Sequence, residues 1–256
     1  MKLRIDQALV DRGLCESRTQ AQRAVMAGQV RVNGHPAKKP SDAVREGDTI
    51  EWLHGDRYVS RGGHQLEHAL QHFAVNPTGL RAVDLGASTG GFTDCLLQHG
   101  ATKVVAVDVG HGQLAWKLRQ DPRVEPLEKL NARHLTLAQL GQLGASAEPF
   151  DLAVIDCSFI SLRMILPAAK GLVRDGGRIV ALIKPQFEAG REEVSRGAGV
   201  IEDPAVHARV LQELEAFVAG SLPGLGWRGV TESPLLGPAG NREFLALLEK
   251  NGSSPT

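Results

Sequence analysis

From about residue 80 onward, short apolar runs alternate with segments whose apolar residues recur at helical spacing. Runs such as VVAVDV and LAVID are apolar at nearly every position, which is typical of strands covered on both faces of a parallel sheet. The predicted strands are Ala82–Leu85, Lys103–Asp108, Asp151–Ile155, Arg178–Ile183, Trp227–Val230 and Phe244–Leu248. Because strands that alternate with helices form βαβ units, the pattern predicts a doubly wound α/β domain.

The first 54 residues follow a different pattern. Apolar residues at helical spacing predict short helices over residues 5–13 and 17–28, each ending at a glycine. The period then changes to two, which predicts a strand at Val30–Val32, a turn at Asn33-Gly34 and a later strand at Thr49–Leu53. We therefore expect a small α+β domain ahead of the large one.

Positive charge is concentrated in this small domain. Residues 1–45 carry nine basic and four acidic side chains, a net charge of +5, whereas the whole chain has 29 of each sign. Guanidinium groups suit phosphates, and the candidates for contacts with RNA are Arg4, Arg18, Arg23 and Arg31. A basic surface that meets only solvent would have the same composition, so charge alone leaves both interpretations open.

Composition argues against several classes of protein. Cys15, Cys95 and Cys157 are odd in number and form no CxxC pair, which favours a reduced, cytoplasmic chain over a disulfide scaffold or a zinc site. The sequence has no apolar run of about 18 residues, and charges interrupt its first 13 positions. We therefore expect neither a membrane span nor a signal peptide.

The first predicted strand of the large domain leads into a glycine-rich turn, VDLGASTGGF. Ligands of doubly wound sheets bind at the carboxyl ends of the strands, so this turn is a candidate binding site. Asp84 is unfavourable beside a pyrophosphate and suits a cationic or zwitterionic ligand, and the turn lacks the GxGxxG spacing of dinucleotide sites. Asp108 ends the second strand, where a carboxylate can hold two ribose hydroxyls.

This DxGxSxGG pattern with its second carboxylate resembles the S-adenosylmethionine site of class I methyltransferases. The sulfonium and ammonium groups of that cofactor need acceptors rather than a phosphate cradle. Asn131 lies in LEKLNARHL, after a further strand expected between the Lys103–Asp108 and Asp151–Ile155 strands, where it could approach an adenine. The candidate cofactor-binding residues are Asp84, Gly86, Ser88, Gly90, Gly91, Phe92, Asp108, Asn131 and Asp156.

Opposite charges follow two further strands. Asp156 follows the Asp151–Ile155 strand and Lys184 the Arg178–Ile183 strand, so a carboxylate and an ammonium are expected to face each other at one rim of the sheet. An ion pair that only stabilises the strand ends would have the same sequence pattern. Glu243 lies at the start of the last strand, where a solvent-facing position is the simpler interpretation.

Together these residues resemble the Lys-Asp-Lys-Glu tetrad of FtsJ-like ribose 2′-O-methyltransferases. RIDQALVDRGLCESRTQAQRAVMAGQVRVNG resembles the alpha-L RNA-binding module of a small-subunit ribosomal protein, pseudouridine synthases and tyrosyl-tRNA synthetase. The combination is similar to the TlyA, or hemolysin A, family of rRNA cytidine 2′-O-methyltransferases. The motifs that carry this resemblance are SRGGxxL at 60–66, DLGASTGGFTDCLLQxGA at 84–101, DCSFISL at 156–162, IKPQFEAGREEV at 183–194 and SPLxGPxGNxEF at 233–244.

The resemblance implies an alpha-L RNA-binding domain at 1–54, a linker at 55–61, a class I methyltransferase (Rossmann-like) domain at 62–250 and a disordered tail at 251–256. It implies S-adenosylmethionine as cofactor and ribosomal RNA or ribosomal subunits as partner. Lys184 would deprotonate or orient the ribose hydroxyl, Asp156 would hold Lys184 and the target, and Glu243 would complete the network.

The fourth catalytic position departs from the family. Gln65 stands where the family pattern SRGGxKL has its first lysine, and a glutamine brings neither positive charge nor acid–base capacity. If that lysine mainly positions the target, activity survives with weaker binding. If its charge is needed, the protein is a slow enzyme or an RNA-binding factor that retains only the cofactor site, unless Arg61 or His64 compensates.

Three other interpretations are less well supported. The older family name suggests a pore-forming hemolysin, but no basic amphipathic helix stands out. A nicotinamide-dependent oxidoreductase fits the glycine-rich turn poorly. His64, His68 and His72 recur at a spacing of four, but they lie off the apolar stripe of their helix and no fourth ligand is evident, so we expect no metal.

Overall fold

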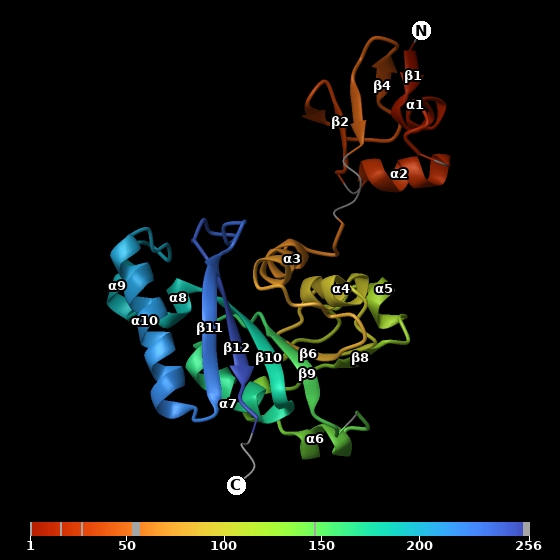
Figure 1. The fold of residues 1–256 in the computed structure, drawn as a ribbon. Helices are drawn as coiled ribbons and strands as arrows, with labels where there is room; N and C mark the ends of the chain where they lie inside the picture. The colour runs from red at the N-terminus through yellow and green to blue at the C-terminus, as the bar shows by residue number, and fades with distance from the viewer. Residues whose placement is uncertain (1, 16, 27, 53–56, 146, 253–256) are drawn as a thin grey trace. The chain divides into compact units, whose positions relative to one another are not determined.

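The computed structural model describes residues 2–15, 17–26, 28–52, 57–145 and 147–252. The chain divides into two compact units, Met1–Arg57 and Tyr58–Thr256, and each is described by itself (Figure 1). Residues 55 and 56 of the predicted linker and 253–256 of the predicted tail lie outside the described residues. Residues 58–61 belong to the second unit, where the backbone N–H of Val59 donates to Asp94 Oδ2 at 2.9 Å.

The described residues of the first unit form an α+β domain with two helices and two small sheets. Its elements are β1 (Lys2–Arg4), α1 (Ile5–Asp11), α2 (Arg18–Met26), β2 (Val30–Val32), β3 (His35–Pro36), β4 (Ala43–Arg45) and β5 (Ile50–Trp52). One sheet has the order β3-β2-β5, and the other pairs β1 with β4 antiparallel. Its core includes Leu9, Ala21, Val25 and Val30, all nearly inaccessible to solvent.

Most of this unit agrees with the sequence predictions. Both helices are present, the turn at Asn33-Gly34 joins β2 to β3, and β5 occupies the predicted last strand, of which Leu53 lies outside the described residues. The prediction missed β1 and β4. These three-residue strands are too short to show an alternating pattern, and their pairing joins residues 2–4 to residues 43–45.

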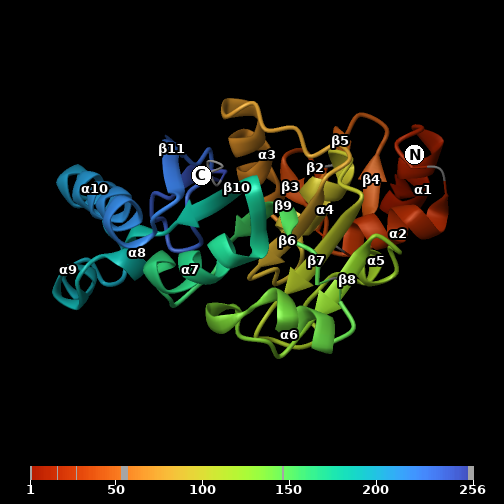
Figure 2. The same cartoon turned by 60° about the horizontal axis from the view of Figure 1, so that its bottom comes forward.

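A seven-stranded sheet forms the centre of the second unit (Figure 2). Its strands are β6 (Arg81–Leu85), β7 (Lys103–Val107), β8 (Val124–Leu127), β9 (Phe150–Ile155), β10 (Val173–Ile183), β11 (Leu225–Glu232) and β12 (Phe244–Lys250). The order is β11-β12-β10-β9-β6-β7-β8, with β12 antiparallel to both of its neighbours. All six predicted strands are confirmed, and β6, β7, β9 and β10 end at the same edge of the sheet.

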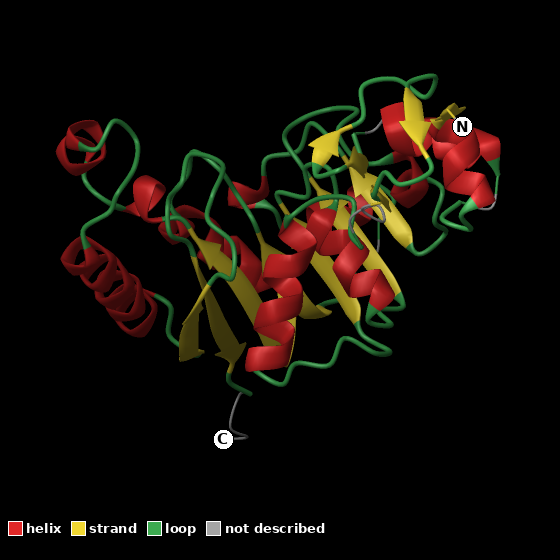
Figure 3. Ribbon diagram, turned by 90° about the horizontal axis from the view of Figure 1, so that it is seen from above, coloured by secondary structure: helices red, strands yellow, loops and turns green. Residues whose placement is uncertain are grey.

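Helices cover both faces of this sheet (Figure 3). The helices are α3 (Gly62–His72), α4 (Gly91–Gln98), α5 (Trp116–Arg119), the 3-10 helix η1 (Ala132–His134), α6 (Leu137–Gln142), α7 (Leu162–Leu172), α8 (Pro185–Glu188), α9 (Arg191–Arg196) and α10 (Pro204–Ser221). One apolar core joins the sheet to α3, α4 and α5, and the other joins it to α6, α7 and α10. The predicted doubly wound α/β architecture is therefore confirmed.

The second unit begins with a tight contact between Tyr58 and α3. Tyr58 is 1% exposed and belongs to the core beneath α3 and α4. A Cβ at Gly63 would lie 2.1 Å from Tyr58 Cγ, so the helix can approach the ring only because this residue has no side chain. The contact fixes the first turn of α3, which carries Gln65.

We expect Gly63→Ala to lower the free energy of unfolding by about 1–3 kcal/mol, because the new methyl group must displace a buried ring. Gly171→Ala in the exposed part of α7 is the matched control, since a Cβ there meets nothing within 4 Å and alanine favours helix by about 0.5–1 kcal/mol. Denaturant unfolding followed by circular dichroism measures both. Equal midpoints for the two variants would contradict the packing argument.

Candidate active site

Backbone conformations that favour glycine shape the turn after β6. Gly86 has φ +90° and Gly90, just before α4, has φ +95°. A Cβ at Gly86 would lie 2.5 Å from the backbone oxygen of Asp156, so a side chain there would push the ends of β6 and β9 apart. The backbone N–H of Ser88 donates to Asp108 Oδ2 at 2.8 Å, which ties the turn to the end of β7.

A cavity of about 440 Å³ opens at these strand ends. The predicted cofactor-binding residues that line it are Gly86, Ser88, Asp108, Asn131 and Asp156. A hollow of about 80 Å³ is lined by Gly91 and Phe92 and shares Gly86, Ser88 and Asp156 with the cavity. Gly90 lines neither, because it packs under Leu118. The sequence analysis missed the apolar part of the wall, formed by Val109, Leu130, Phe159, Ile160 and Ile165.

Two polar residues of the cavity have part of their hydrogen-bonding capacity filled by the protein. Asp108 accepts from the backbone N–H of Ser88 on Oδ2 and, at 2.6 Å, from that of Gly110 on Oδ1. Asn131 Oδ1 accepts from the backbone N–H of Arg133 at 2.9 Å and so caps η1. Both side chains are therefore held in fixed orientations at the cavity wall.

Asp84 is placed differently from the prediction. Its side chain is 0% exposed, does not line the cavity, and accepts a hydrogen bond from Thr93 Oγ1 at 2.7 Å. The reason is the alternation of side chains along β6, because Asp84 shares its face with Ala82 and points toward the layer of α4. Burial raises the pKa of Asp84 to about 7, against the opposing hydrogen bond from Thr93.

Asp156 and Lys184 form an ion pair at the rim of the sheet, as predicted. The Lys184 side chain is 12% exposed and that of Asp156 27%, so both reach the surface of the site. Lys184 Nζ also donates to Ser158 Oγ at 3.1 Å, a contact that the sequence analysis missed. The ends of β9 and β10 thus hold the ammonium in one place.

Gln65 and Glu243 form a second, buried pair. Gln65 Nε2 donates to Glu243 Oε2 at 2.8 Å and to Ser233 Oγ at 3.0 Å. Gln65 is 7% exposed and Glu243 3%, so the solvent-facing interpretation of Glu243 is wrong. Ser233 was part of a recognised motif, but its contact with a residue 168 positions away has no signature in sequence spacing.

The two pairs belong to one electrostatic cluster. Burial raises the pKa of Glu243, and the negative charge of Asp156 raises it further. The hydrogen bond from Gln65 and the positive charges of Lys184 and Arg61 lower it. The structure therefore brings all four predicted catalytic residues together, and Arg61 adds a positive charge to the surroundings of Glu243.

The arginine candidates of the first unit are of two kinds. Arg4 donates to both oxygens of Asp6 at 2.9 Å, and Arg18 donates to Asp6 Oδ2 at 3.2 Å. These guanidinium groups hold the pKa of the buried Asp6 carboxyl well below its usual range. Arg23 and Arg31 are exposed. All four candidates thus reach solvent, and Arg4 and Arg18 also bind a carboxylate.

The histidines of α3 show no metal-binding arrangement. His68 Nε2 lies 3.2 Å from Thr231 Oγ1, and the ring of His72 stacks on that of His68 at 6.0 Å. Across the described ranges, no group of three or more His, Cys, Asp or Glu side chains is arranged to hold a metal ion.

Among the helices that the structure describes, none is long and apolar enough to cross a membrane.

We expect Asp84→Asn to remove a pH dependence of stability. Because the folded-state pKa is about 7 and the ordinary value 3.8, the folded protein keeps a proton that the unfolded chain releases between these values. Stability of the parent protein should therefore fall as pH rises through that window, by about 1.4 kcal/mol per unit for this group.

Urea unfolding of both proteins at pH 5, 6, 7 and 8 measures the effect. The free energy of unfolding of Asp84→Asn, relative to the parent, should rise by about 2–3 kcal/mol between pH 5 and pH 7 and level off above. Glu215→Gln, on the exposed face of α10, controls for the loss of a carboxylate. Parallel curves for Asp84→Asn and the parent would show that Asp84 does not retain its proton.

Comparison with known proteins gives the same assignment for both units. The family model of FtsJ-like methyltransferases matches residues 58–250, and that of the S4 domain matches residues 3–50. The chain is 47% identical over 251 residues to the 16S/23S rRNA (cytidine-2′-O)-methyltransferase TlyA of Mycobacterium tuberculosis, covering 96% of this chain and 90% of that protein.

Two further matches agree. Hemolysin A of Brachyspira hyodysenteriae is 39% identical over 246 residues, covering 95% of this chain and 98% of its own. A solved structure from Streptococcus thermophilus, described as a hemolysin, has a TM-score of 0.73 and 45% identity, with 98% of this chain and 90% of that one covered. The chain therefore belongs to the TlyA, or hemolysin A, family, in which an S4 domain precedes an FtsJ-like methyltransferase domain.

Proposed function

We propose that this protein transfers a methyl group from S-adenosylmethionine to the 2′-hydroxyl of a cytidine in ribosomal RNA. The observation that carries the proposal is the cluster of Asp156, Lys184, Gln65 and Glu243 beside a ligand-sized cavity at the strand ends. The M. tuberculosis relative, 47% identical, is named for this reaction on 16S and 23S rRNA. The family membership gives the methyltransferase class, and the site residues are our assignment.

The chemistry of the cavity wall suits the proposed cofactor. Its ionisable lining residues include the carboxylates of Asp108 and Asp156, and no lysine or arginine lines it among the described residues. Such a wall attracts a sulfonium and repels a pyrophosphate. When bound, S-adenosylmethionine supplies the methyl group. Asp108 would hold the ribose, Asn131 and Leu130 would flank the adenine, and the Gly86–Gly91 turn would approach the amino-acid end.

The other residues act on the RNA hydroxyl. Lys184 Nζ, held by Asp156 and Ser158, would orient the 2′-oxygen. After passing its own proton to Asp156 or to solvent, the neutral amine would accept the hydroxyl proton during attack. Gln65 and Glu243, which are hydrogen-bonded to each other and interact electrostatically with Lys184, would complete the network around the hydroxyl. Because the reaction is a direct displacement, orientation is the main contribution of these residues and can supply about 7–11 kcal/mol.

The S4 domain is the proposed docking element for ribosomal RNA or a ribosomal subunit. The exposed Arg23 and Arg31, together with Arg4 and Arg18 on Asp6, would contact phosphates. Such contacts recognise the shape of folded RNA rather than its bases, as expected for A-form helices.

A second function is favoured by one observation. Gln65 meets Glu243 without the positive charge of the family's lysine, so the protein could bind cofactor and RNA without turnover. The two functions differ in one measurable property, which is methyl transfer by the unmodified protein.

We expect the protein to transfer labelled methyl groups from S-adenosylmethionine to purified ribosomal subunits, with the label at ribose after nuclease mapping. Lys184→Ala should lower kcat by about 10²–10⁴-fold, because both the hydroxyl's orientation and its proton acceptor are lost. Lys103→Ala is the matched control, since it breaks a lysine ion pair with Glu125 at the opposite end of the sheet. Equal rates for both variants would remove Lys184 from the mechanism.

For Gln65→Lys we expect the KM for RNA to fall while kcat changes by less than about tenfold, because Gln65 already binds Glu243. Gln71→Lys, on the exposed end of the same helix, controls for added charge. The same label-transfer assay, run at several RNA concentrations, gives both constants. Methylation by Gln65→Lys with none by the unmodified protein would establish the RNA-binding factor instead.

A further inference from the structure

Two chain segments run side by side from the active-site ion pair. The first, residues 156–161, joins β9 to α7, and the second, residues 184–188, follows β10 and forms α8. The strands that deliver them are parallel neighbours, with Ile155 opposite Ala181. At the strand ends, Lys184 contacts Asp156 and Ser158, which is the first connection between the segments.

A second connection lies farther from the strands. The rings of Phe159 and Phe187 are 5.1 Å apart between centroids. Phe159 has φ +65°, a left-handed conformation that is strained for an aromatic residue, and the residue is 91% exposed. The conformation of Phe159 is thus stabilised neither by an intrinsic backbone preference nor by burial of its ring. The 156–161 segment must therefore be held in this conformation by contacts of its other residues.

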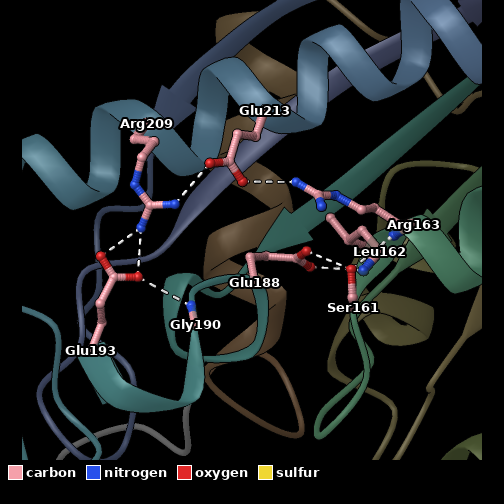
Figure 4. Close-up of polar contacts among 8 residues, drawn as sticks. All are labelled: Ser161, Leu162, Arg163, Glu188, Gly190, Glu193, Arg209 and Glu213. Carbon is pink, nitrogen blue, oxygen red and sulfur yellow. Dashed lines mark hydrogen bonds and ion pairs between the residues drawn. The ribbon is translucent and has the colours of Figure 1, made fainter. Parts of the chain in front are cut away.

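The third connection is the Glu188 carboxylate, which closes the far end (Figure 4). Glu188 Oε2 accepts from Ser161 Oγ at 2.6 Å and Oε1 accepts from the backbone N–H of Leu162 at 2.7 Å. Ser161 Oγ in turn accepts from the backbone N–H of Arg163 and caps α7. Both carboxylate oxygens thus hold the residues at which the 156–161 segment becomes a helix.

Burial of this carboxylate is unfavourable, and it raises the pKa of Glu188. Glu188 also lies on a one-turn helix whose own backbone bonds run back to Lys184 and Pro185: Phe187 N–H donates to Lys184 at 2.8 Å, and Ala189 N–H to Pro185 at 2.9 Å. Because one helical turn connects the two residues, a shift of Glu188 would also shift the backbone of Lys184.

We propose that Glu188 is a positioning residue for the active site: by fastening residues 161 and 162 to α8, it holds Asp156 and Ser158 against Lys184. The same contact fixes Phe159 and Ile160, which form part of the cavity wall. The effect of Glu188 on catalysis rests on the proposed function, whereas its effect on the position of residues 156–162 does not.

A neighbouring network supplies a matched control. Glu213 on α10 accepts from Arg163 at 3.0 Å and from Arg209 at 2.7 Å, and Arg209 also donates to Glu193 (Figure 4). The side chains of this network join α7, α9 and α10, and among the described residues none of these side chains hydrogen-bonds to residues 156–161. Glu213→Ala therefore weakens helix packing without releasing the segment.

In the methyl-transfer assay we expect Glu188→Ala to lower kcat by about 10- to 100-fold with the KM for RNA changed by less than about threefold, because the hydroxyl is bound but misoriented. Glu188→Gln should recover part of kcat, since its amide oxygen can still accept from Leu162. Glu213→Ala should keep kcat within about twofold at a similar loss of Tm. Losses of kcat that simply follow Tm across the three variants would overturn the proposal.

Amide hydrogen exchange tests the positioning without activity. The experiment is run with S-adenosylhomocysteine added to each protein. The backbone amides of residues 156–162 should exchange at least about tenfold faster in Glu188→Ala than in the parent protein and in Glu213→Ala. Unchanged exchange in this segment would overturn the proposal even if kcat fell. If the parent protein methylates no ribosomal RNA, the proposed function fails, and the exchange comparison still decides the role of Glu188.

Discussion

The close approach of Gly86 to the backbone of Asp156 is the contact on which the site depends. A single Cβ at Gly86 would come within 2.5 Å of that backbone oxygen, so the turn after β6 lies directly against the end of β9. Asp156 consequently belongs to two environments, since it lines the cavity and also pairs with Lys184. The cavity and the Lys184 ammonium therefore meet at this residue.

The replacement of a lysine by Gln65 changes the charge of the cluster. Asp156, Lys184 and Glu243 carry a net charge of −1 when all are ionised, whereas the family's additional lysine would bring the sum to zero. The raised pKa of Glu243 favours uptake of a proton, which would restore neutrality at this position. Such a proton would remove a negative charge, whereas the family's lysine adds a positive one and has a longer side chain than a carboxyl group.

The sequence predicted those features that depend on local pattern. Buried strands such as β7 and β9 are continuous apolar runs, and residues that follow parallel strands meet at one edge, so Asp156 and Lys184 could be paired in advance. The orientation of Asp84 could have been found from its alternation with Val83 and Leu85.

Other features depend on contacts between distant positions, which one sequence does not reveal. The contact of Gln65 with Ser233 and the pairing of β1 with β4 are of this kind. The carboxylate of Glu188 belongs to the same class, because nothing in its own segment indicates that Ser161 is its partner.

The carboxylate of Asp6 has a consequence for how the S4 domain would respond to salt. Arg4 and Arg18 already neutralise a carboxylate, so each would release fewer of the counterions condensed on the RNA than a free guanidinium group would. The logarithm of RNA affinity should therefore fall with the logarithm of salt concentration less steeply than a count of basic side chains suggests.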